Sequence, residues 1–199
     1  MKPVITGKIA MSSRDLAPDA GVTTGIRHIR ITNDLELLTV VAAGRVLIDA
    51  GIDVPAGTPD MGLFIGIDEA IEDIKDEYFS NVLNDGLVGA SPLLFPFTSP
   101  NAFTAQASIA YDIRGESITF FMKNIYSDVI LYSLDCVRAG HIKMAVSGGI
   151  SLKHDDLSVN EGRYAAEFYF IEDLKSARSR GARIYSVQED WMNGFFSID

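Results

Sequence analysis

The run MGLFIGI (Met61–Ile67) is apolar at every position. A strand with one face in water alternates apolar and polar side chains, so an unbroken apolar run is typical of a strand covered on both faces. Such a strand lies inside a sheet that carries helices on each side. The rest of the chain must therefore supply the helices that cover it.

Helical patterns flank this run. Asn33 followed by Glu36 forms a capping box, and apolar residues then recur at helical spacing as far as Gly51, a natural helix stop. The acidic segment 68–83 is a second amphipathic helix. Its apolar residues are expected to face inward: Ile71, Ile74, Tyr78 and Val82. Further strands are expected at 3–11, 115–121, 141–151, 163–172 and 182–191, and further helices at 102–113, 125–140 and 173–181.

Strands and helices alternate along the chain, which predicts an α/β fold with a largely parallel sheet. The length of 199 residues suits a single domain over 1–199. Lysines and arginines number 17 against 27 aspartates and glutamates, a net charge of −10 that disfavours nucleic acid and anionic membranes as partners. We expect a cytoplasmic protein, because no signal peptide or apolar run of membrane-spanning length stands out.

One cysteine excludes an internal disulfide and a cysteine-based zinc site. We expect no metal and no cofactor. The paired glycines Gly148 and Gly149 lack the spacing of a phosphate-binding loop. The histidines fall in predicted loops or element ends without metal-ligand spacing: His28, His141 and His154.

The segment RGESITFFMKNIYSD (Arg114–Asp128) combines a strand pattern, a sharp turn and a helix pattern. Many α/β enzymes place a nucleophile at such a turn. Here the apex holds Met122, Lys123 and Asn124, and the first serine past it is Ser127. No histidine motif stands beside that serine to activate it. The turn is either a site built from other residues or an active-site position that has lost its nucleophile.

Four segments carry a resemblance to a known family. They are TNDLELLTVVAAGRVLIDAGI, SPLLFPFTSPNAFTAQASIAYDIRGESITF, VRAGHIKMAVSGG and EGRYAAEFYFIEDLKSARSRGARIY. In this order they resemble the β-ketoacyl synthase family, which has the thiolase fold. Each motif is weak alone, but the four in sequence span nearly the whole chain and are specific together.

The resemblance implies a thiolase-like half, with a mixed, mostly parallel sheet and helices on both faces. The family's full subunit packs two such halves together, and this sequence resembles the first, with residues 183–199 similar to the start of the second. In the family, a cysteine at the helix tip takes the acyl group. The corresponding position here falls near Asn124. The two catalytic histidines belong to the second half, so the resemblance implies a protein without condensing activity.

These features favour a non-catalytic, ketosynthase-like protein that acts as a structural or heterodimer partner in fatty-acid or polyketide-type biosynthesis. A second hypothesis is a small acyl-binding or acyl-transfer enzyme that uses Lys123 or Ser127. A third is a decayed gene fragment. Acyl carrier protein is expected to bind weakly, because such carriers are acidic like this chain. A local basic patch could instead outweigh the net charge and strengthen this binding. Its members would be Arg178, Arg180 and Arg183.

The resemblance also implies a homodimer, or a heterodimer with a full ketosynthase. In the family, the strand before the nucleophile pairs antiparallel with its mate across a two-fold axis. The corresponding edge residues here are Ser117, Ile118, Thr119, Phe120 and Phe121. An exposed apolar edge associates unless it is paired. The helix at 125–140 is expected to be covered by the C-terminal tail, by a second copy of the chain or by a full synthase. The tail offers four apolar residues as a candidate lid: Trp191, Met192, Phe195 and Phe196.

The remaining candidates have plainer interpretations. Cys136, inside an apolar helix, is expected to be a buried core residue. Lys123 is expected to be an exposed or snorkelling lysine, and Ser127 and Asp128 to cap or pack. The dense carboxylates of the second helix are expected to form a solvated face rather than a metal site: Asp68, Glu69, Glu72, Asp73, Asp76 and Glu77.

Overall fold

Five strands form one mixed sheet in the order β1-β5-β4-β2-β3 within the part of the chain that the computed structural model describes, residues 1–16, 31, 33–121, 125–152 and 163–185. The strands are β1 (Pro3–Ser12), β2 (Met61–Ile67), β3 (Ser117–Phe121), β4 (Met144–Leu152) and β5 (Tyr164–Asp173). β5 is antiparallel to both β1 and β4, whereas β2 is parallel to β3 and β4. Four of these five strands thus share one direction, as the sequence predicts.

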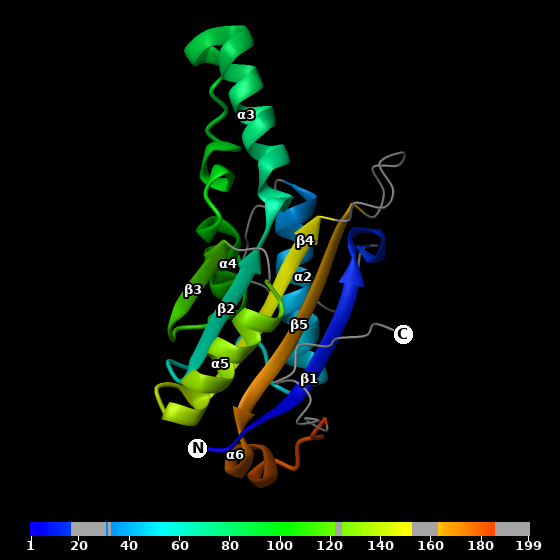
Figure 1. Cartoon of the computed structure of the whole chain (residues 1–199), viewed down its shortest axis with the longest axis vertical. Coiled ribbons are helices and arrows are strands. Elements are labelled where there is room, and N and C mark those ends of the chain that lie inside the picture. The colour runs from blue at the N-terminus through cyan, green and yellow to red at the C-terminus, as the bar shows by residue number, and fades with distance from the viewer. Residues whose placement is uncertain (17–30, 32, 122–124, 153–162, 186–199) are drawn as a thin grey trace.

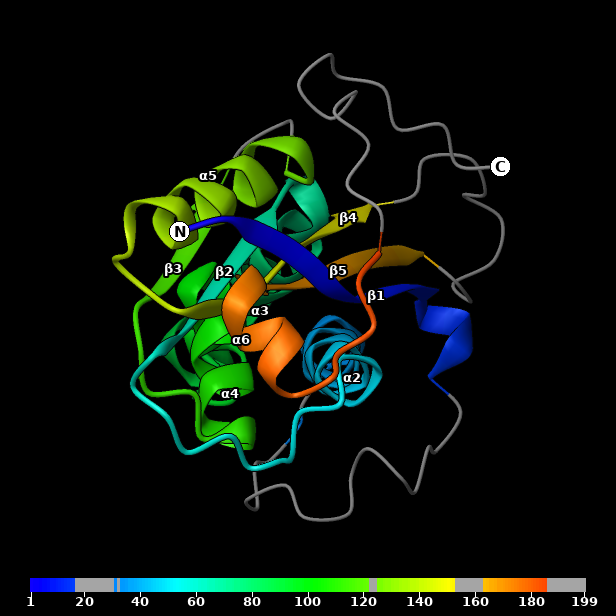
Figure 2. The same cartoon turned by 90° about the horizontal axis from the view of Figure 1, so that it is seen from below.

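Helices cover both faces of this sheet (Figures 1 and 2). They are α2 (Asp34–Asp49), α3 (Glu72–Asp85), α4 (Asn101–Tyr111), α5 (Ser127–Ala139) and α6 (Leu174–Ser179). α2 and α4 pack on one face, and α5 packs on the other. β2 lies between these layers and is buried at every position, which confirms the prediction that MGLFIGI is a strand covered on both faces. The fold is therefore the mixed α/β layer expected from the sequence.

α2 begins and ends where the sequence predicts. The side chain of Asn33 accepts a hydrogen bond from the backbone N–H of Glu36 at 2.8 Å, which satisfies one of the free donors at the helix start. Gly51, just past the end, has a φ of 69°, a conformation that glycine adopts without steric cost. Between these ends the helix buries an apolar surface that includes Leu35, Leu38 and Leu47 against β1, β4 and β5.

The opposite face holds a smaller core beneath α5. Val129, Ile130 and Val137 of the helix meet Phe64 of β2 and Ile171 of β5. Cys136 is buried in the same cluster, as predicted. α5 ends at Gly140, whose positive φ of 79° and backbone N–H bonds to the last helical carbonyls form a left-handed cap.

The segment 72–98, which we call the arm, projects past the ends of the strands (Figure 1). It comprises α3 and two short helical turns, η3 (Gly86–Gly89) and η4 (Phe95–Thr98). The sequence placed Tyr78 and Val82 on an inward face, and both are half-buried, less than Ile71 and Ile74. Beyond Ile74 this side of α3 meets the returning segment η3–η4 instead of the sheet, and Tyr78 packs against Phe95 with ring centroids 5.8 Å apart.

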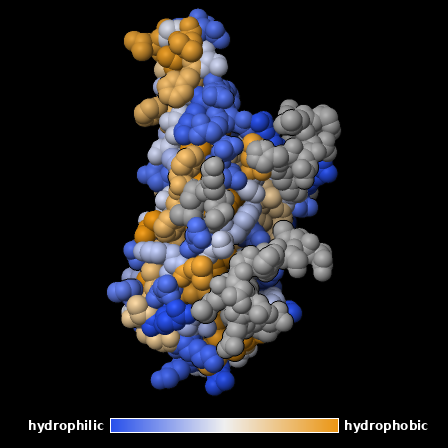
Figure 3. All heavy atoms as spheres, in the orientation of Figure 1, coloured by the Kyte–Doolittle hydropathy of each residue, from blue (hydrophilic) through white to orange (hydrophobic). Residues whose placement is uncertain are grey.

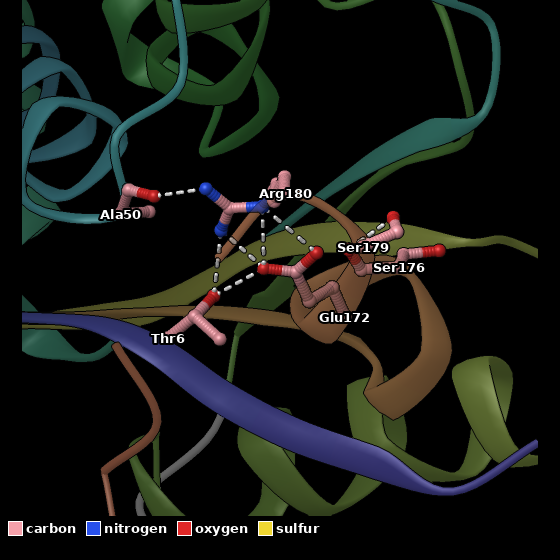
Figure 4. Close-up of polar contacts among 6 residues, drawn as sticks. All are labelled: Thr6, Ala50, Glu172, Ser176, Ser179 and Arg180. Atoms are coloured by element: carbon pink, nitrogen blue, oxygen red, sulfur yellow. Dashed lines mark hydrogen bonds and ion pairs between the residues drawn. The ribbon is translucent and has the colours of Figure 1, made fainter. Parts of the chain in front are cut away.

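The end of α6 is tied to the body by a buried ion pair (Figure 4). The guanidinium of Arg180 binds the carboxylate of Glu172, which is 1% exposed. It also donates to the backbone oxygen of Ala50 at 2.6 Å and to the hydroxyl of Thr6 at 3.3 Å, and Thr6 in turn donates to Glu172 at 2.6 Å. One side chain thus joins β1, β5, α6 and the end of α2.

The strand expected at 182–191 is represented by an isolated antiparallel bridge between Ile5 and Tyr185. Residues 186–199 lie outside the described part of the chain. Among the described residues, none of the helices has both the length and the apolar character needed to cross a bilayer.

Candidate functional site

Ile125 and Tyr126, which lead from the elbow into α5, lie over β2 and β4. Gly66 of β2 and Gly149 of β4 are register partners beneath it. A Cβ added at Gly66 would lie 2.7 Å from the backbone oxygen of Ile125, and one at Gly149 would lie 3.1 Å from side-chain atoms of Ile125 and Tyr126. Glycine at both positions therefore lets the start of α5 rest directly on the sheet.

The predicted nucleophile position near Asn124, and Lys123 beside it, lie outside the described residues. Ser127 and Asp128, which follow the elbow, belong to the first turn of α5. The hydroxyl of Ser127 donates to the carboxylate of Asp128 at 3.3 Å. A hydroxyl that faces a carboxylate directly, without an imidazole between them, lacks the arrangement of a triad nucleophile.

Hydroxyl groups gather beside the elbow on the α5 face of the sheet. The phenol of Tyr126 and the hydroxyl of Ser151 lie 2.8 Å apart. On β5, the phenol of Tyr169 donates to the carboxylate of Glu167, which is the register partner of Gly149. The ammonium of Lys8 lies 3.8 Å from that carboxylate. These contacts place two phenols, one hydroxyl and one ion pair around the start of α5.

Both phenols stay protonated at neutral pH. Burial raises the pKa of Tyr126 to about 12, and its hydrogen bond with Ser151 offsets part of that rise. Burial and the hydrogen bond to Glu167 raise the pKa of Tyr169 well above its ordinary value. Such groups can donate hydrogen bonds, but they supply no base that could activate a nucleophile near neutral pH.

The remaining sequence candidates are dispersed. Burial raises the pKa of the Cys136 thiol, so it is not a reactive thiolate. His141 is exposed at the far end of α5, and His28 and His154 lie outside the described residues. Gly148 and Gly149 lie inside β4, which confirms that they are not a phosphate loop.

The acidic residues of 68–77 do not share one role. Asp68 accepts from the backbone N–H groups of Ala70 and Leu152 at 2.9 and 3.2 Å. Asp73 binds Arg163 at 2.6 Å and accepts from the Tyr164 phenol. The reading of these residues as one solvated face is therefore wrong for Asp68 and Asp73. No group of three potential metal ligands occurs among the described residues.

β3 lies at one edge of the sheet, where the sequence analysis placed the pairing strand. Among the described strands it bonds to β2 alone. Thr119 shares a hydrogen bond of 2.6 Å with Thr104, and Phe120 packs edge-on against Tyr132 with ring centroids 5.1 Å apart. Ser117 and Phe121 are exposed, while Ile118, Thr119 and Phe120 are half-buried. The strand is thus held firmly on one side and presents its other edge outward.

Two other surfaces were predicted from the sequence, a basic patch and a lid. Arg180 is occupied by Glu172, so it does not contribute to a basic patch with Arg178 and Arg183. Arg183 lies over the ring of Tyr185 at 4.6 Å. The predicted lid falls outside the described residues: Trp191, Met192, Phe195 and Phe196.

Sequence reasoning missed the cluster beside the elbow. Tyr126 and Ser151 are 25 positions apart, and Lys8 and Glu167 lie on β1 and β5 at opposite ends of the chain. Only the strand order brings them together. The alternation of Glu167 and Tyr169 on β5 was the available signal, because it puts both on one face of the sheet.

Comparison with known proteins identifies the family. The family model "Beta-ketoacyl synthase, N-terminal domain" matches residues 15–166. No curated protein matches the chain.

Several solved structures share the fold. The ishigamide ketosynthase/chain length factor aligns with a TM-score of 0.74 at 17% identity, over 92% of this chain and 60% of that one. A type II PKS acyl-carrier protein in complex with its ketosynthase bound to the hexaketide gives 0.70 at 11% identity, over 92% and 61%. A β-ketoacyl synthase from Burkholderia phymatum STM815 gives 0.65 at 16% identity, over 92% and 62%.

The chain thus spans about three fifths of the length of these structures. At such low identity the structural likeness shows the fold, while the family-model match extends over most of the sequence. The chain belongs to the β-ketoacyl synthase family and carries that family's N-terminal domain.

Proposed function

We propose that this chain is a non-catalytic, ketosynthase-like protein that acts as a structural or heterodimer partner in fatty-acid or polyketide-type biosynthesis. The observation that carries the proposal is the elbow, where the sequence reads Met122-Lys123-Asn124. Gly66 and Gly149 lie beneath Ile125 and Tyr126, where the chain enters α5, and the sequence of the apex before them holds no cysteine.

The surroundings of the elbow support this proposal. A condensing cysteine is activated by the start of a helix and by nearby bases. Here the described polar side chains at the start of α5 include Tyr126, which bonds Ser151, and Ser127, and burial raises the pKa of the Tyr126 phenol. The single cysteine, Cys136, belongs to the last turns of α5 and is buried there.

A role as a partner is supported by two observations. The first is the outward edge of β3, a continuous strand edge of the kind that pairs with another chain. The second is the kind of protein with which the chain shares its fold: a ketosynthase/chain length factor, and a ketosynthase in complex with its acyl-carrier protein. We accordingly infer that a ketosynthase is the partner. A cytoplasmic location stays a prediction from sequence.

The proposal is tested by a condensation assay with acyl- and malonyl-carrier substrates. We expect no product above the uncatalysed background from this chain alone. We also expect Asn124→Cys not to restore turnover, because the histidine among the described residues, His141, lies at the far end of α5. Turnover by the wild-type chain, or an acyl adduct on Lys123 or Ser127 seen by intact mass, would overturn the proposal in favour of an acyl-transfer enzyme.

A further inference from the structure

We propose that the outer edge of β1 is closed by a clasp centred on the carboxylate of Asp49, and that this clasp keeps β1 from pairing with the β1 strand of a second copy. Residues 180–185 supply the other half of the clasp. The inference goes beyond the proposed function, because it concerns the edge of the sheet opposite β3 and does not depend on which protein pairs with β3.

β1 is a long strand at the edge of the sheet. It spans 10 residues, and in the part of the chain that the structure describes it has one neighbouring strand, β5. Its sequence PVITGKIAMS is rich in residues that favour strands and carries one charged side chain, Lys8. A long edge of this kind is a template for another chain unless the protein closes it.

The clasp occupies outward-facing backbone groups in the first half of β1. One oxygen of Asp49, Oδ2, accepts from the backbone N–H of Lys8 at 2.8 Å and from the phenol of Tyr185 at 2.8 Å. The backbone N–H of Tyr185 donates to the backbone oxygen of Ile5 at 2.9 Å. An incoming strand would need these same groups of Lys8 and Ile5 for its own ladder. The carboxylate would also repel the carbonyl oxygens that such a strand brings.

The segment that carries Tyr185 is fixed before it reaches β1. Arg180 donates to the backbone oxygen of Ala50, the residue after Asp49, at 2.6 Å. The guanidinium carbon of Arg183 lies 4.6 Å from the ring centroid of Tyr185. Figure 2 shows the chain after α6 running along β1 beside the end of α2. The clasp therefore joins parts of the chain that are already held together, so closing it orders few additional groups.

Asp49 is poorly placed for the helix that carries it. It is the last residue of α2, a helix with two acidic residues in its first turn and no basic residue in its last turn. The C-terminal end of a helix carries a partial negative charge, which disfavours a carboxylate there. A residue that breaks a local rule points to a compensating contact elsewhere. The two hydrogen bonds that Asp49 accepts from Lys8 and Tyr185 are such a contact.

The rest of the β1 edge carries further features that hinder pairing. Pro3, at its start, has no N–H to offer. The register with β5 shifts between Ile5 and Gly7, and a bulge of this kind bends an edge away from other strands. At the other end, the carboxylate of Asp15 accepts from the backbone N–H of Ser12 at 2.6 Å. β3, by contrast, pairs with β2 over its whole length without a register shift, so the two edges of the sheet are built differently.

Hydrogen exchange at the Lys8 amide, followed by NMR, tests the clasp itself. Asp49→Ala removes the acceptor and should speed the exchange of this amide about tenfold or more. Asp49→Asn keeps an oxygen acceptor in the same place and should restore most of the protection. Asp53→Ala is the matched control: it removes an exposed carboxylate four residues further along, and it should leave the exchange of Lys8 unchanged.

Self-association tests what the clasp prevents. Asp49→Ala combined with Tyr185→Phe opens the edge, while the phenylalanine keeps the ring that packs on the smaller core. Sedimentation velocity of this opened variant should show species larger than any that the wild type forms at the same concentration. Asp49→Asn alone should keep the size of the wild type. Adding Lys8→Pro to the opened variant should abolish the larger species, because proline offers no N–H to an incoming strand.

Ala10→Lys in the opened variant is a second reversal that leaves the fold intact. Ala10 is exposed, and its register partner on β5 is Glu167. Within one copy the added ammonium has that carboxylate beside it. In a pair of β1 strands it would lie near Lys8 and the added lysine of the other copy, and like charges across paired strands are destabilising. The larger species should then need a higher protein concentration to form.

Unchanged exchange of the Lys8 amide in Asp49→Ala, or an opened variant that keeps the size of the wild type, would overturn the inference. Larger species that persist with Lys8→Pro and with Ala10→Lys would show association through another surface, and they would overturn it as well. None of these measurements involves condensing activity or a ketosynthase, so the proposed function is tested separately.

Discussion

At the scale of a single residue, Arg180 joins three parts of the fold: β5, β1 and the end of α2. Its guanidinium is the partner of Glu172, whose carboxylate is buried beside Thr6. Arg180→Ala would leave that carboxylate buried without its cation, and removing one partner of a buried pair costs about 3–5 kcal/mol. We expect the free energy of unfolding to fall by about 3 kcal/mol in urea denaturation.

Arg178→Ala is the control, because Arg178 lies exposed in the last turn of the same short helix. It should change the free energy of unfolding by about 0.5 kcal/mol or less. Equal effects of the two substitutions would mean that the ion pair with Glu172 adds nothing to the fold.

Two buried tyrosines make the stability of the fold depend on pH. Burial raises the pKa of Tyr126 and of Tyr164 to about 12, and for Tyr164 the charge of Asp73 adds to the rise. Their pKa in the unfolded chain is about 10. The stability they contribute is therefore full below pH 10 and is lost as the pH rises through 12.

Absorbance at 295 nm measures this titration. Tyr126→Phe and Tyr164→Phe should each remove one late-ionising phenol from the wild-type curve. If all seven tyrosines of the chain ionise together near pH 10, the burial of these two phenols is contradicted.

At the residue scale the sequence predicted caps and core residues well and the polar cluster poorly. The cap Asn33, the stop Gly51 and the buried Cys136 follow from local chemistry, which is readable from neighbouring letters. The cluster of Tyr126, Ser151, Glu167 and Lys8 depends on strand order, which local pattern does not encode.

At the scale of elements, the contact between α5 and the sheet depends on two glycines. Gly66→Ala would put a Cβ 2.7 Å from the backbone oxygen of Ile125 and 2.8 Å from its Cβ, so α5 would have to shift. Overpacking of this kind costs about 1–3 kcal/mol. We expect a lower melting temperature and faster amide exchange in the first turn of α5, compared with Asn84→Ala on the exposed arm as a control.

A protein in which Gly66→Ala melts like wild type would show that α5 does not rest on β2 as described. The substitution is informative because the added Cβ would meet the backbone of Ile125, just before α5, and the buried side chains of Ile125 and Val129, not a flexible side-chain end.

Element types and most boundaries were predictable from the sequence, but the arm was not. Ile71, Ile74, Tyr78 and Val82 have helical spacing, which predicts a helix with an apolar side. Spacing does not say whether another element lies opposite that side. Beyond Ile74 the described structure offers only the thin returning segment η3–η4 opposite α3, so Leu83, Leu87 and Val88 at the tip of the arm are exposed instead of forming core. Figure 3 shows the apolar surface at this tip.

At the scale of the whole molecule, charge governs which partners can approach. The chain carries a net charge of −10, and Arg180, the central member of the expected basic patch, is occupied by Glu172. Acyl carrier proteins are acidic, so long-range repulsion opposes their binding. Fluorescence polarisation at physiological salt should give a Kd weaker than about 100 μM, and binding in the low micromolar range would contradict this expectation.

The central claim is that this chain is a partner of a ketosynthase. Sedimentation velocity of the chain mixed with the full-length ketosynthase encoded nearest to its gene tests it most directly, at concentrations of about 10 μM. We predict a new boundary with the mass of one copy of each protein. Thr119→Pro should abolish this boundary, because proline disrupts the strand edge. Thr104→Val is its control: it removes the hydrogen bond between Thr104 and Thr119, which the proline variant also loses, and it should keep the boundary. Two proteins that sediment independently at every ratio would contradict the account.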